Sequence, residues 1–299
     1  MKTISIVIPN WNGEGKLKKN LPFVIDSTKD FNVKEIIVVD DKSTDQSVEI
    51  LKKEFPDIKL IEKNKNTGFS STVNLGVKSA NSDLVVLLNS DASPKKDFLK
   101  YLVPHFEEKQ IFSVSCNVGG VWNVAQFKEG FFWHSQAAVA EKDKNSSHNT
   151  VWASGGSGIF RKDIWDRLGG LDELFDPFYE EDLDLGYRAL KRGYINLWEP
   201  KSQVDHYQEA GVIEANFSKE RVARVAQRNQ LQFIWKNITS KQLIQQHNKA
   251  LVKKIIQHPK YWLIVQSALI NLPALLEKRA IEIKESTVTD EEILEANGS

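Results

Sequence analysis

Cysteine is almost absent from this 299-residue sequence, and methionine is equally rare. The single cysteine, Cys116, excludes an internal disulfide, so the fold must be held by its core. Nine prolines and 16 glycines are too few for a collagen-like or low-complexity chain. The most apolar segment, residues 261–276, is shorter than the ~20 residues of a membrane span and contains polar side chains. These absences favour a globular protein in a reducing compartment, and we expect a cytoplasmic location.

An excess of one charge is also missing, because 40 lysines and arginines balance 40 aspartates and glutamates. The balance is uneven along the chain, since residues 219–279 hold 12 basic and 2 acidic side chains. Together with the apolar segment, this basic excess predicts contact with an anionic membrane surface, and we expect no nucleic-acid partner. The alternatives are a solvated helical face, packing on the rest of the chain, or a homodimer contact.

The first hundred residues alternate short β-branched runs with longer amphipathic stretches. Continuous apolar runs indicate strands covered on both faces, and the β-α repetition predicts a mostly parallel sheet with flanking helices. The expected strands are residues 4–9, 36–39, 58–61 and 84–88, and the expected helices are residues 16–27, a segment ending at 54 that Ser43 or Asp45 would cap, and 70–80.

Two parts of the chain follow from this pattern. Residues 1–217 form the expected α/β domain, in which residues 111–160 are a mixed β region with long loops. Residues 218–299 form a helical extension. Its acidic end, beyond residue 282, is expected to be mobile.

Polar side chains end two of the predicted strands. Asp40 and Asp41 follow the second strand, where open parallel sheets bind ligands, and a carboxylate there can accept hydrogen bonds from a base or a ribose. Asn89, Ser90 and Asp91 end the fourth strand, and oxygen ligands of this kind suit Mg²⁺ or Mn²⁺. Since both segments lie at one sheet edge, they predict a shared ligand site.

Four acids crowd the start of a later helix: Glu180, Glu181, Asp182 and Asp184. A helix N-terminus stabilises one or two acids without any function, but four repel one another and favour a shifted pKa. A general base is the chemical role that such an acid can fill. Asp184 can instead pair with Arg188 one turn later.

Together these segments resemble family 2 of the glycosyltransferases, a large group with the GT-A fold, related to the Rossmann fold. The likeness covers about residues 3–238. Within the family it is greatest to rhamnosyltransferase-like members that build surface polysaccharides. It rests on the segments IVIPNWN, VVDDKSTDQS, KNTGFSSTVNLGV, LLNSDASP, ASGGSGIFRKDIWDRLGGLDELFDPFYEEDLDLGYRALKRGY, EP…VDHY and RNQLQFIWKN, in that order.

The resemblance implies a role for each matching residue. Asp182 matches the catalytic base, and Asp91 with His206 matches the ligands of a divalent cation, Mg²⁺ or Mn²⁺. Asn89 departs from the family pattern, which has an acid at this position of the metal motif. The residues implied to bind substrates are, for the acceptor, Trp152 and Glu181 and, for the donor, Pro9, Asn12, Asp40, Asp41, Lys65, Asn66, Gly68, Asn89, Ser90, Asp91, Gly155 and Gly156.

The implied reaction is an inverting transfer of a sugar from a nucleotide-sugar donor to a hydroxyl group of a glycan or a polyprenyl-linked acceptor. The implied setting is cell-surface polysaccharide synthesis, in the cytoplasm or at the inner face of the cell membrane. A non-catalytic GT-A-like protein that binds a sugar nucleotide or a partner is the alternative. A nicotinamide-dependent dehydrogenase is disfavoured because the turn after the first strand lacks the G-x-G-x-x-G pattern.

Aromatic side chains in residues 117–155 allow two interpretations. They could stack on sugar faces in an acceptor pocket, or they could belong to the core. They are Trp122, Phe131, Phe132, Trp133 and Trp152.

Overall fold

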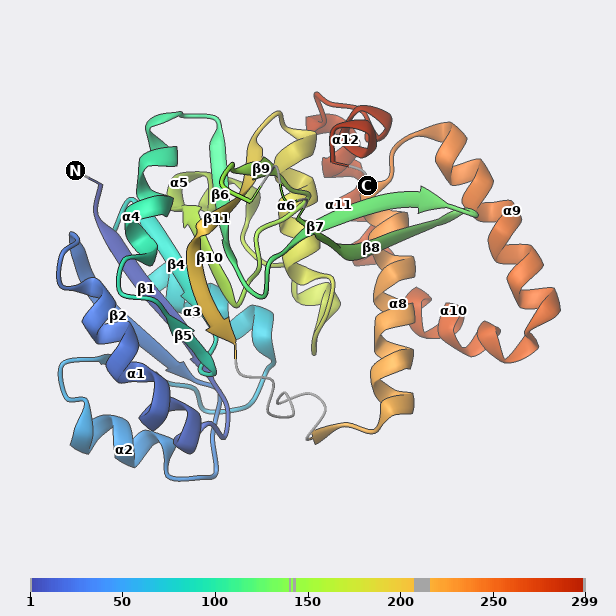
Figure 1. The fold of residues 1–299 in the computed structure, drawn as a ribbon. Coiled ribbons are helices and arrows are strands. Elements are labelled where there is room, and N and C mark those ends of the chain that lie inside the picture. The colour runs from blue at the N-terminus through green and yellow to red at the C-terminus, as the bar shows by residue number, and fades with distance from the viewer. Residues whose placement is uncertain (1, 140, 142–143, 207–215, 298–299) are drawn as a thin grey trace.

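The fold comes from a computed structural model, which describes residues 2–139, 141, 144–206 and 216–297. One side of the molecule is an α/β part built around a nine-stranded sheet, and the other is a group of C-terminal helices (Figure 1). A two-stranded hairpin, β7 (Val121–Lys128) with β8 (Phe131–Ala138), reaches from the first part towards the second. The predicted fold class, a mostly parallel sheet with flanking helices and a helical extension, is confirmed.

Parallel pairing organises the first half of the sheet. The strand order is β3-β2-β1-β4-β10-β6-β11-β5, with β9 beside β11. β1 pairs in parallel with β2 and β4, whereas β10 and β5 are antiparallel to their neighbours. The carboxyl ends of β1, β2 and β4 therefore meet at one edge. The strands are β1 (Ile4–Asn10), β2 (Val33–Asp40), β3 (Lys59–Glu62), β4 (Leu84–Leu88), β5 (Ala92–Pro94), β6 (Ile111–Asn117), β9 (His148–Asn149), β10 (Ser157–Arg161) and β11 (Ile195–His206).

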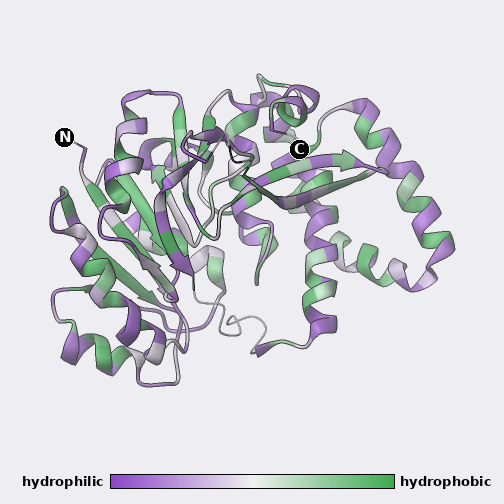
Figure 2. Cartoon of the chain, in the orientation of Figure 1, coloured by the Kyte–Doolittle hydropathy of each residue, from purple (hydrophilic) through white to green (hydrophobic). Residues whose placement is uncertain are grey.

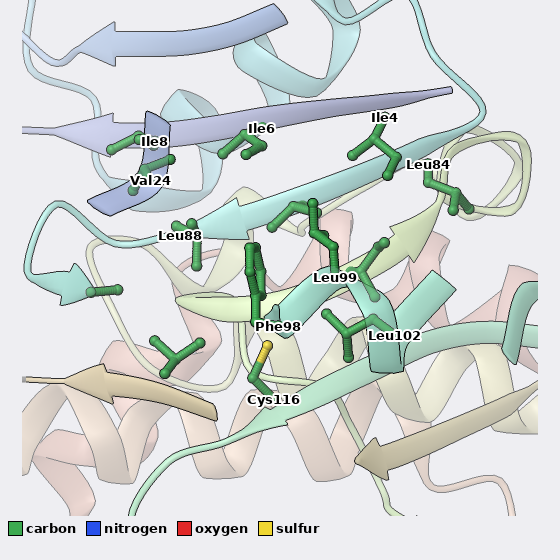
Figure 3. Packing of buried hydrophobic residues seen from close by; sticks show 14 of the residues in the cluster. Ile4, Ile6, Ile8, Val24, Leu84, Leu88, Phe98, Leu99, Leu102 and Cys116 are labelled. Carbon is green, nitrogen blue, oxygen red and sulfur yellow. The ribbon is translucent and has the colours of Figure 1, made fainter. Parts of the chain in front are cut away.

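Helices cover both faces of the sheet. Ile4, Ile6 and Ile8 of β1 lie in one buried cluster with side chains of α1 and α4 (Figure 3), whereas Val7 lies in a second cluster with α3. A strand buried on both faces needs apolar residues at successive positions, which explains the continuous apolar run. Cys116 lies in the first cluster, and burial raises the pKa of its thiol to about 12. These elements are α1 (Glu14–Thr28), α2 (Ser47–Glu54), α3 (Phe69–Ser79), α4 (Phe98–Leu102), η1 (Val103–Glu107), α5 (Lys162–Leu168), η3 (Glu173–Phe175) and α6 (Glu181–Lys191).

The C-terminal helices share a core with the α/β part. The ring of Phe233 in α8 lies 4.6 Å from that of Phe132 in β8 and 5.3 Å from that of Tyr187 in α6, measured between centroids. Figure 2 shows that these helices alternate apolar and polar residues, as helices with one buried side do. They are α8 (Lys219–Asn237), α9 (Lys241–Gln257), η4 (Pro259–Tyr261), α10 (Trp262–Leu269), α11 (Leu272–Glu285) and α12 (Asp290–Asn297).

The acidic end of the chain packs against α6 instead of hanging free. The carboxylate of Asp290, in α12, is fully buried and accepts hydrogen bonds from Tyr187 Oη (2.7 Å) and Lys191 Nζ (2.8 Å). It also accepts bonds from the backbone N–H groups of Thr239 and Ser240, both at 2.7 Å. The expectation of a mobile tail is therefore wrong as far as α12 extends. A buried lysine needs a carboxylate partner, and composition alone does not reveal such a pair.

The expected cap of α2 also needs correction. Ser43 does not cap the helix, because its hydroxyl donates to Asp40 (2.5 Å) and accepts from the N–H of Asn12 (2.8 Å). The N-cap position belongs to Gln46. Asp45 does contribute, since its carboxylate accepts from the N–H of the first helical residue at 3.0 Å.

Among the described residues, no helix is long and apolar enough to cross a membrane. The apolar segment at residues 261–276 is divided between η4, α10 and α11, with a break at Ile270 and Asn271. A short amphipathic helix of this kind can contact a membrane surface with its apolar side.

Candidate active site

A cavity of about 540 Å³ opens at the edge where β1, β2 and β4 end. Most of the residues expected to bind a substrate or a metal, or to act as the base, lie in its wall, together with five aromatic residues that were not predicted as site residues. The expected residues in the wall are Pro9, Asp41, Asn66, Gly68, Asn89, Ser90, Asp91, Gly155, Gly156, Glu181, Asp182 and His206, and the additional aromatic residues are Trp11, Phe69, Phe178, Tyr179 and Phe217.

Asp40 and Asp41 have different places although they are adjacent. The carboxylate of Asp40 is buried and accepts hydrogen bonds from Asn10 Nδ2 (2.9 Å) and from the N–H and hydroxyl of Ser43. Asp40 therefore orders the turn after β2 and is not part of the cavity wall. Asp41 lines the cavity, and it accepts bonds from two consecutive backbone N–H groups of residues 67–68 at 3.0 and 2.9 Å.

Two further residues expected to bind the donor, Asn12 and Lys65, do not line this cavity. Asn12 Oδ1 accepts a hydrogen bond from the N–H of Thr44 (2.8 Å), which ties the turn after β1 to the turn after β2. Lys65 is exposed beside Asn66, which does line the cavity. Contact of Asn12 and Lys65 with a donor stays a prediction.

Glycine at residues 155 and 156 lets two backbone segments approach the site closely. A Cβ atom on Gly156 would lie 2.4 Å from Asn89 Nδ2, so no larger residue fits without moving that side chain. The N–H of Asn89 also donates to the carbonyl of Gly156 at 2.9 Å. Gly155 donates its N–H to Asp182 Oδ2 at 3.1 Å. The two glycines thus connect the end of β4 to the start of α6.

Asp91 and His206 meet although 115 positions (206 − 91) separate them in the sequence. β5 pairs with β11, and His206 Nε2 lies 2.9 Å from Asp91 Oδ1. Lys16 Nζ, from α1, lies 3.2 Å from Asp91 Oδ2. Burial alone would raise the pKa of Asp91, but the hydrogen bond and charge of His206, followed by Lys16, hold that pKa below its usual value. Asp91 is therefore ionised at neutral pH.

This pair suits a divalent cation that is shared with a phosphate group. The described residues contain no group of three or more histidine, cysteine, aspartate or glutamate side chains that could hold a metal ion by themselves. Mg²⁺ is commonly held by only one or two carboxylates together with substrate phosphates, and Mn²⁺ also prefers oxygen ligands. Asp91 and His206 both face the cavity, so they fit such a site. Asn89 also lines the cavity, but its neutral amide would bind the cation less strongly than an acid at this position.

A second cavity, of about 430 Å³, adjoins the first on the side of the β7–β8 hairpin. Its wall includes Trp152 and His134, which are not part of the first cavity. Six residues line both cavities and so lie between them. They are Asn89, Ser154, Tyr179, Glu181, Asp182 and His206.

Asp182 and Glu181 both lie between the two cavities, and their surroundings shift the pKa values of the two carboxyl groups to different extents. Asp182 accepts hydrogen bonds from the N–H groups of Gly155 (3.1 Å) and Leu183 (2.8 Å). Glu181 is 9% exposed, and its Oε2 has no hydrogen-bond partner among the described residues. Burial raises the pKa of both carboxyl groups, and the charge of Asp182 raises that of Glu181 further. The pKa of Glu181 is raised further than that of Asp182, so Glu181 holds a proton more readily than its neighbour.

His134 is a site residue that the sequence did not single out. From β8, its Nε2 lies 3.1 Å from Glu180 Oε1, and its ring makes an edge contact with Trp152. Burial alone would lower the pKa of His134, but the hydrogen bond and charge of Glu180, with Asp182, raise it. A lone histidine on a short strand gives no sequence signal. The pairing becomes visible only when the hairpin folds over α6.

The aromatic residues of 117–155 divide between core and cavity. Phe131 and Phe132 are buried in the cluster shared with the C-terminal helices, so their interpretation as sugar platforms is wrong. Trp122 and Trp133 are in the wall of neither cavity. Trp152 lines the second cavity but is only 7% exposed, because most of its side chain packs inside.

Comparison with known proteins adds independent findings. The model of "Glycosyl transferase family 2" matches residues 5–169. A dolichyl N-acetyl-alpha-D-glucosaminyl phosphate 3-beta-D-2,3-diacetamido-2,3-dideoxy-beta-D-glucuronosyltransferase of Methanococcus voltae is 30% identical over 129 residues, 41% of this chain and 40% of that protein. An N-acetylglucosaminyl-diphospho-decaprenol L-rhamnosyltransferase of Mycobacterium tuberculosis is 24% identical over 207 residues, 58% of this chain and 66% of that protein.

Among solved structures, GalNAc-T7 with UDP, GalNAc and Mn²⁺ superimposes with a TM-score of 0.67 at 15% identity, over 87% of this chain and 57% of that one. Likeness at this identity concerns the fold, which is GT-A. The chain spans only 14% to 40% of the length of three of the curated relatives that it matches.

Proposed function

Because the chain belongs to glycosyl transferase family 2, we propose that it transfers a sugar from a nucleoside diphosphate donor to a hydroxyl group of a glycan or lipid-linked acceptor. The observation that carries this proposal is the position of the Asp182 carboxyl group, in the wall shared by two adjoining cavities. A transfer between two substrates needs a base at the point where both meet.

In this mechanism the first cavity binds the donor. Asp41 and Asn66 lie at the nucleotide side, and the backbone at Gly156 lets the diphosphate and sugar approach closely. Asp91 and His206 would hold Mg²⁺ or Mn²⁺, and such a cation neutralises charge on the leaving diphosphate. GalNAc-T7, with the same fold, was solved with Mn²⁺ and UDP, which supports this arrangement.

The second cavity binds the acceptor, with its hydroxyl group directed at Asp182. The Asp182 carboxylate takes the hydroxyl proton while the acceptor oxygen forms a bond to the anomeric carbon. The bond from that carbon to the diphosphate oxygen breaks on the opposite side, so the anomeric configuration inverts. Burial raises the pKa of Asp182, which brings it closer to the working pH and makes it a better base.

The donor sugar is not specified by the walls of the cavity. Resemblance to rhamnosyltransferase-like proteins favours rhamnose and a role in cell-surface polysaccharide synthesis, and the rhamnosyltransferase of Mycobacterium tuberculosis is one of the relatives. Thermal unfolding in a panel of sugar nucleotides, with and without Mn²⁺, identifies the donor. A ligand at about 100 times its Kd adds about 2.7 kcal/mol to the free energy of unfolding. No stabilisation by any sugar nucleotide would contradict the proposal.

A non-catalytic protein that binds a sugar nucleotide or a partner is the rival function. Asp91 and Asp182 both line the cavities, and carboxyl groups at these two positions favour turnover instead. The rival would be supported if the protein bound a donor with Mn²⁺ but neither hydrolysed it nor transferred its sugar to any acceptor.

We also propose that α9 and α10 contact an anionic membrane surface from the cytoplasmic side, where a polyprenyl-linked acceptor would lie. No acidic residue occurs between Glu220 and Glu277. Lys249, Lys253 and Ile256 recur at helical spacing on one side of α9, and Ile256 is 74% exposed. Apolar side chains beside lysines are the composition that binds anionic interfaces.

Flotation with phosphatidylglycerol vesicles tests this surface. Ile256→Asp with Leu263→Asp should abolish salt-sensitive flotation, whereas Phe23→Asp, which changes a comparably exposed apolar residue on α1, should not. Equal flotation of all variants would contradict the proposal. Self-association of the wild type that the double variant abolishes would indicate a homodimer contact instead.

A further inference from the structure

The segment that leads into α6 has an unusual backbone. Tyr179 and Glu180 are consecutive and both lie in the left-handed region, with φ of 72° and 77°. Side chains other than glycine adopt this conformation only where the surroundings enforce it. Tyr179 lines both cavities, and Glu180 directly precedes Glu181 and Asp182 in the first turn of α6. The conformation of residues 175–180 therefore determines where the carboxylate of Asp182 lies.

Asn229 of α8 contacts this segment through its backbone carbonyl groups. Its side chain is fully buried. Asn229 Nδ2 donates to the carbonyl oxygens of Phe175 (2.7 Å), Phe178 (2.9 Å) and Tyr179 (2.9 Å). An amide has only two N–H hydrogens, so two of these acceptors share one of them. A single buried side chain thus binds three carbonyl groups in the segment that leads into the bend.

Arg228 orients Asn229 and adds a fourth contact. Arg228 Nε donates to Asn229 Oδ1 at 2.8 Å. Because a guanidinium group can only donate, this bond identifies the amide oxygen as the acceptor and directs the amide nitrogen towards the segment. Arg228 Nη2 also donates to the carbonyl of Asp176 at 2.5 Å. The two residues together bind the carbonyl groups of 175, 176, 178 and 179.

Both residues belong to the C-terminal helices and lie outside the cavity walls. We propose that Arg228 and Asn229 are positioning residues that hold residues 175–180 in the bent conformation and thereby place Tyr179 and Asp182 between the two cavities. The proposal rests on the proposed function for its catalytic consequence. Its structural part, the holding of the segment, stands independently of any activity.

Gln232 provides a matched control. It lies on the same helix, is also fully buried, and its amide donates to a single carbonyl, that of Ala268 in α10 (3.2 Å), away from the segment. Asn229→Ala and Gln232→Ala each remove a buried amide, so both should lower the unfolding temperature. Only the first should release residues 175–180.

Hydrogen–deuterium exchange of the full chain measures that release. In Asn229→Ala, the amides of residues 178–184 should exchange about tenfold faster than in the wild type, and in Gln232→Ala they should not change. Arg228→Met, at a half-buried position, serves if Asn229→Ala does not fold. It should give a smaller increase in the same residues. Unchanged exchange in the Arg228 and Asn229 variants, or an equal increase in Gln232→Ala, would overturn the proposal.

Turnover of the sugar nucleotide that stabilises the wild type most gives the catalytic consequence. Asn229→Ala should lower kcat about 10- to 100-fold with little change in donor KM, since residues such as Asp41 and Asp91 stay in place. Gln232→Ala should keep the wild-type kcat. Faster exchange with an unchanged kcat would refute the catalytic part. If Asn229→Ala exchanges faster but the wild type itself shows no turnover, the proposed function is refuted and the positioning role stays supported.

Discussion

Asp290 offers a quantitative test of how the C-terminal end is held. Its carboxylate accepts hydrogen bonds from Tyr187, Lys191 and two backbone N–H groups, and Lys191 is as completely buried as Asp290 itself. Asp290→Ala leaves the Lys191 ammonium group in the interior without a counter-charge. Breaking a buried ion pair by removing one partner costs about 3–5 kcal/mol, and the released backbone N–H groups bring the expected loss to the upper part of that range.

Urea unfolding of the full chain measures this loss. Since domains are commonly stable by only about 5–15 kcal/mol, the variant should unfold at a much lower urea concentration. Glu295→Ala, an exposed change on the same helix, should stay within about 0.5 kcal/mol of the wild type. Lys191→Met combined with Asp290→Ala should cost less than the sum of the single changes, because no unpaired charge remains. A loss below about 1 kcal/mol for Asp290→Ala would refute the packing of α12 against α6.

Three further predictions concern the site. Burial raises the pKa of Asp176 to about 6, so the wild type loses stability as pH rises towards that value. Asp176→Asn should therefore be more stable than the wild type at pH 8, by about 1 kcal/mol after allowance for solvent screening, with no difference near pH 4 in thermal melts. Gly156→Ala forces Asn89 to move and should weaken nucleoside diphosphate binding about tenfold in calorimetric titration; unchanged affinity would argue against a donor in this cavity. His206→Ala should weaken Mn²⁺-dependent nucleotide binding about tenfold and leave metal-free binding unchanged, whereas an equal loss in both would exclude a role beside Asp91 in holding the cation.

Local sequence patterns are sufficient to predict the α/β framework. The apolar runs at residues 4–9 and 84–88 predict strands that occur as β1 and β4, because strands buried on both faces must be apolar throughout. Polar residues at the carboxyl ends of parallel strands share one edge of the sheet. This rule predicts a common site for Asp41 and Asp91, and both residues line one cavity.

Residues whose role depends on long-range packing are beyond this reasoning. Asp40 and Asp41 are equivalent in the sequence, but successive side chains of an extended segment point to opposite sides, so only one can face the cavity. Asn229 looks like an ordinary polar residue of an amphipathic helix until residues 175–180 lie against it. The acidic end of the chain has the composition of a solvated tail, and it packs because Asp290 pairs with the buried lysine of α6 and Ile293 lies in the core shared with that helix.

Substitution of Asp182 by asparagine tests the central claim most directly. The change keeps the size of the side chain and removes its ability to take a proton. With the sugar nucleotide and Mn²⁺ that stabilise the wild type, Asp182→Asn should bind the donor with nearly unchanged affinity and lose turnover by about 10²- to 10⁴-fold. Transfer at the wild-type rate by Asp182→Asn would contradict the assignment of this carboxylate as the base between the two cavities.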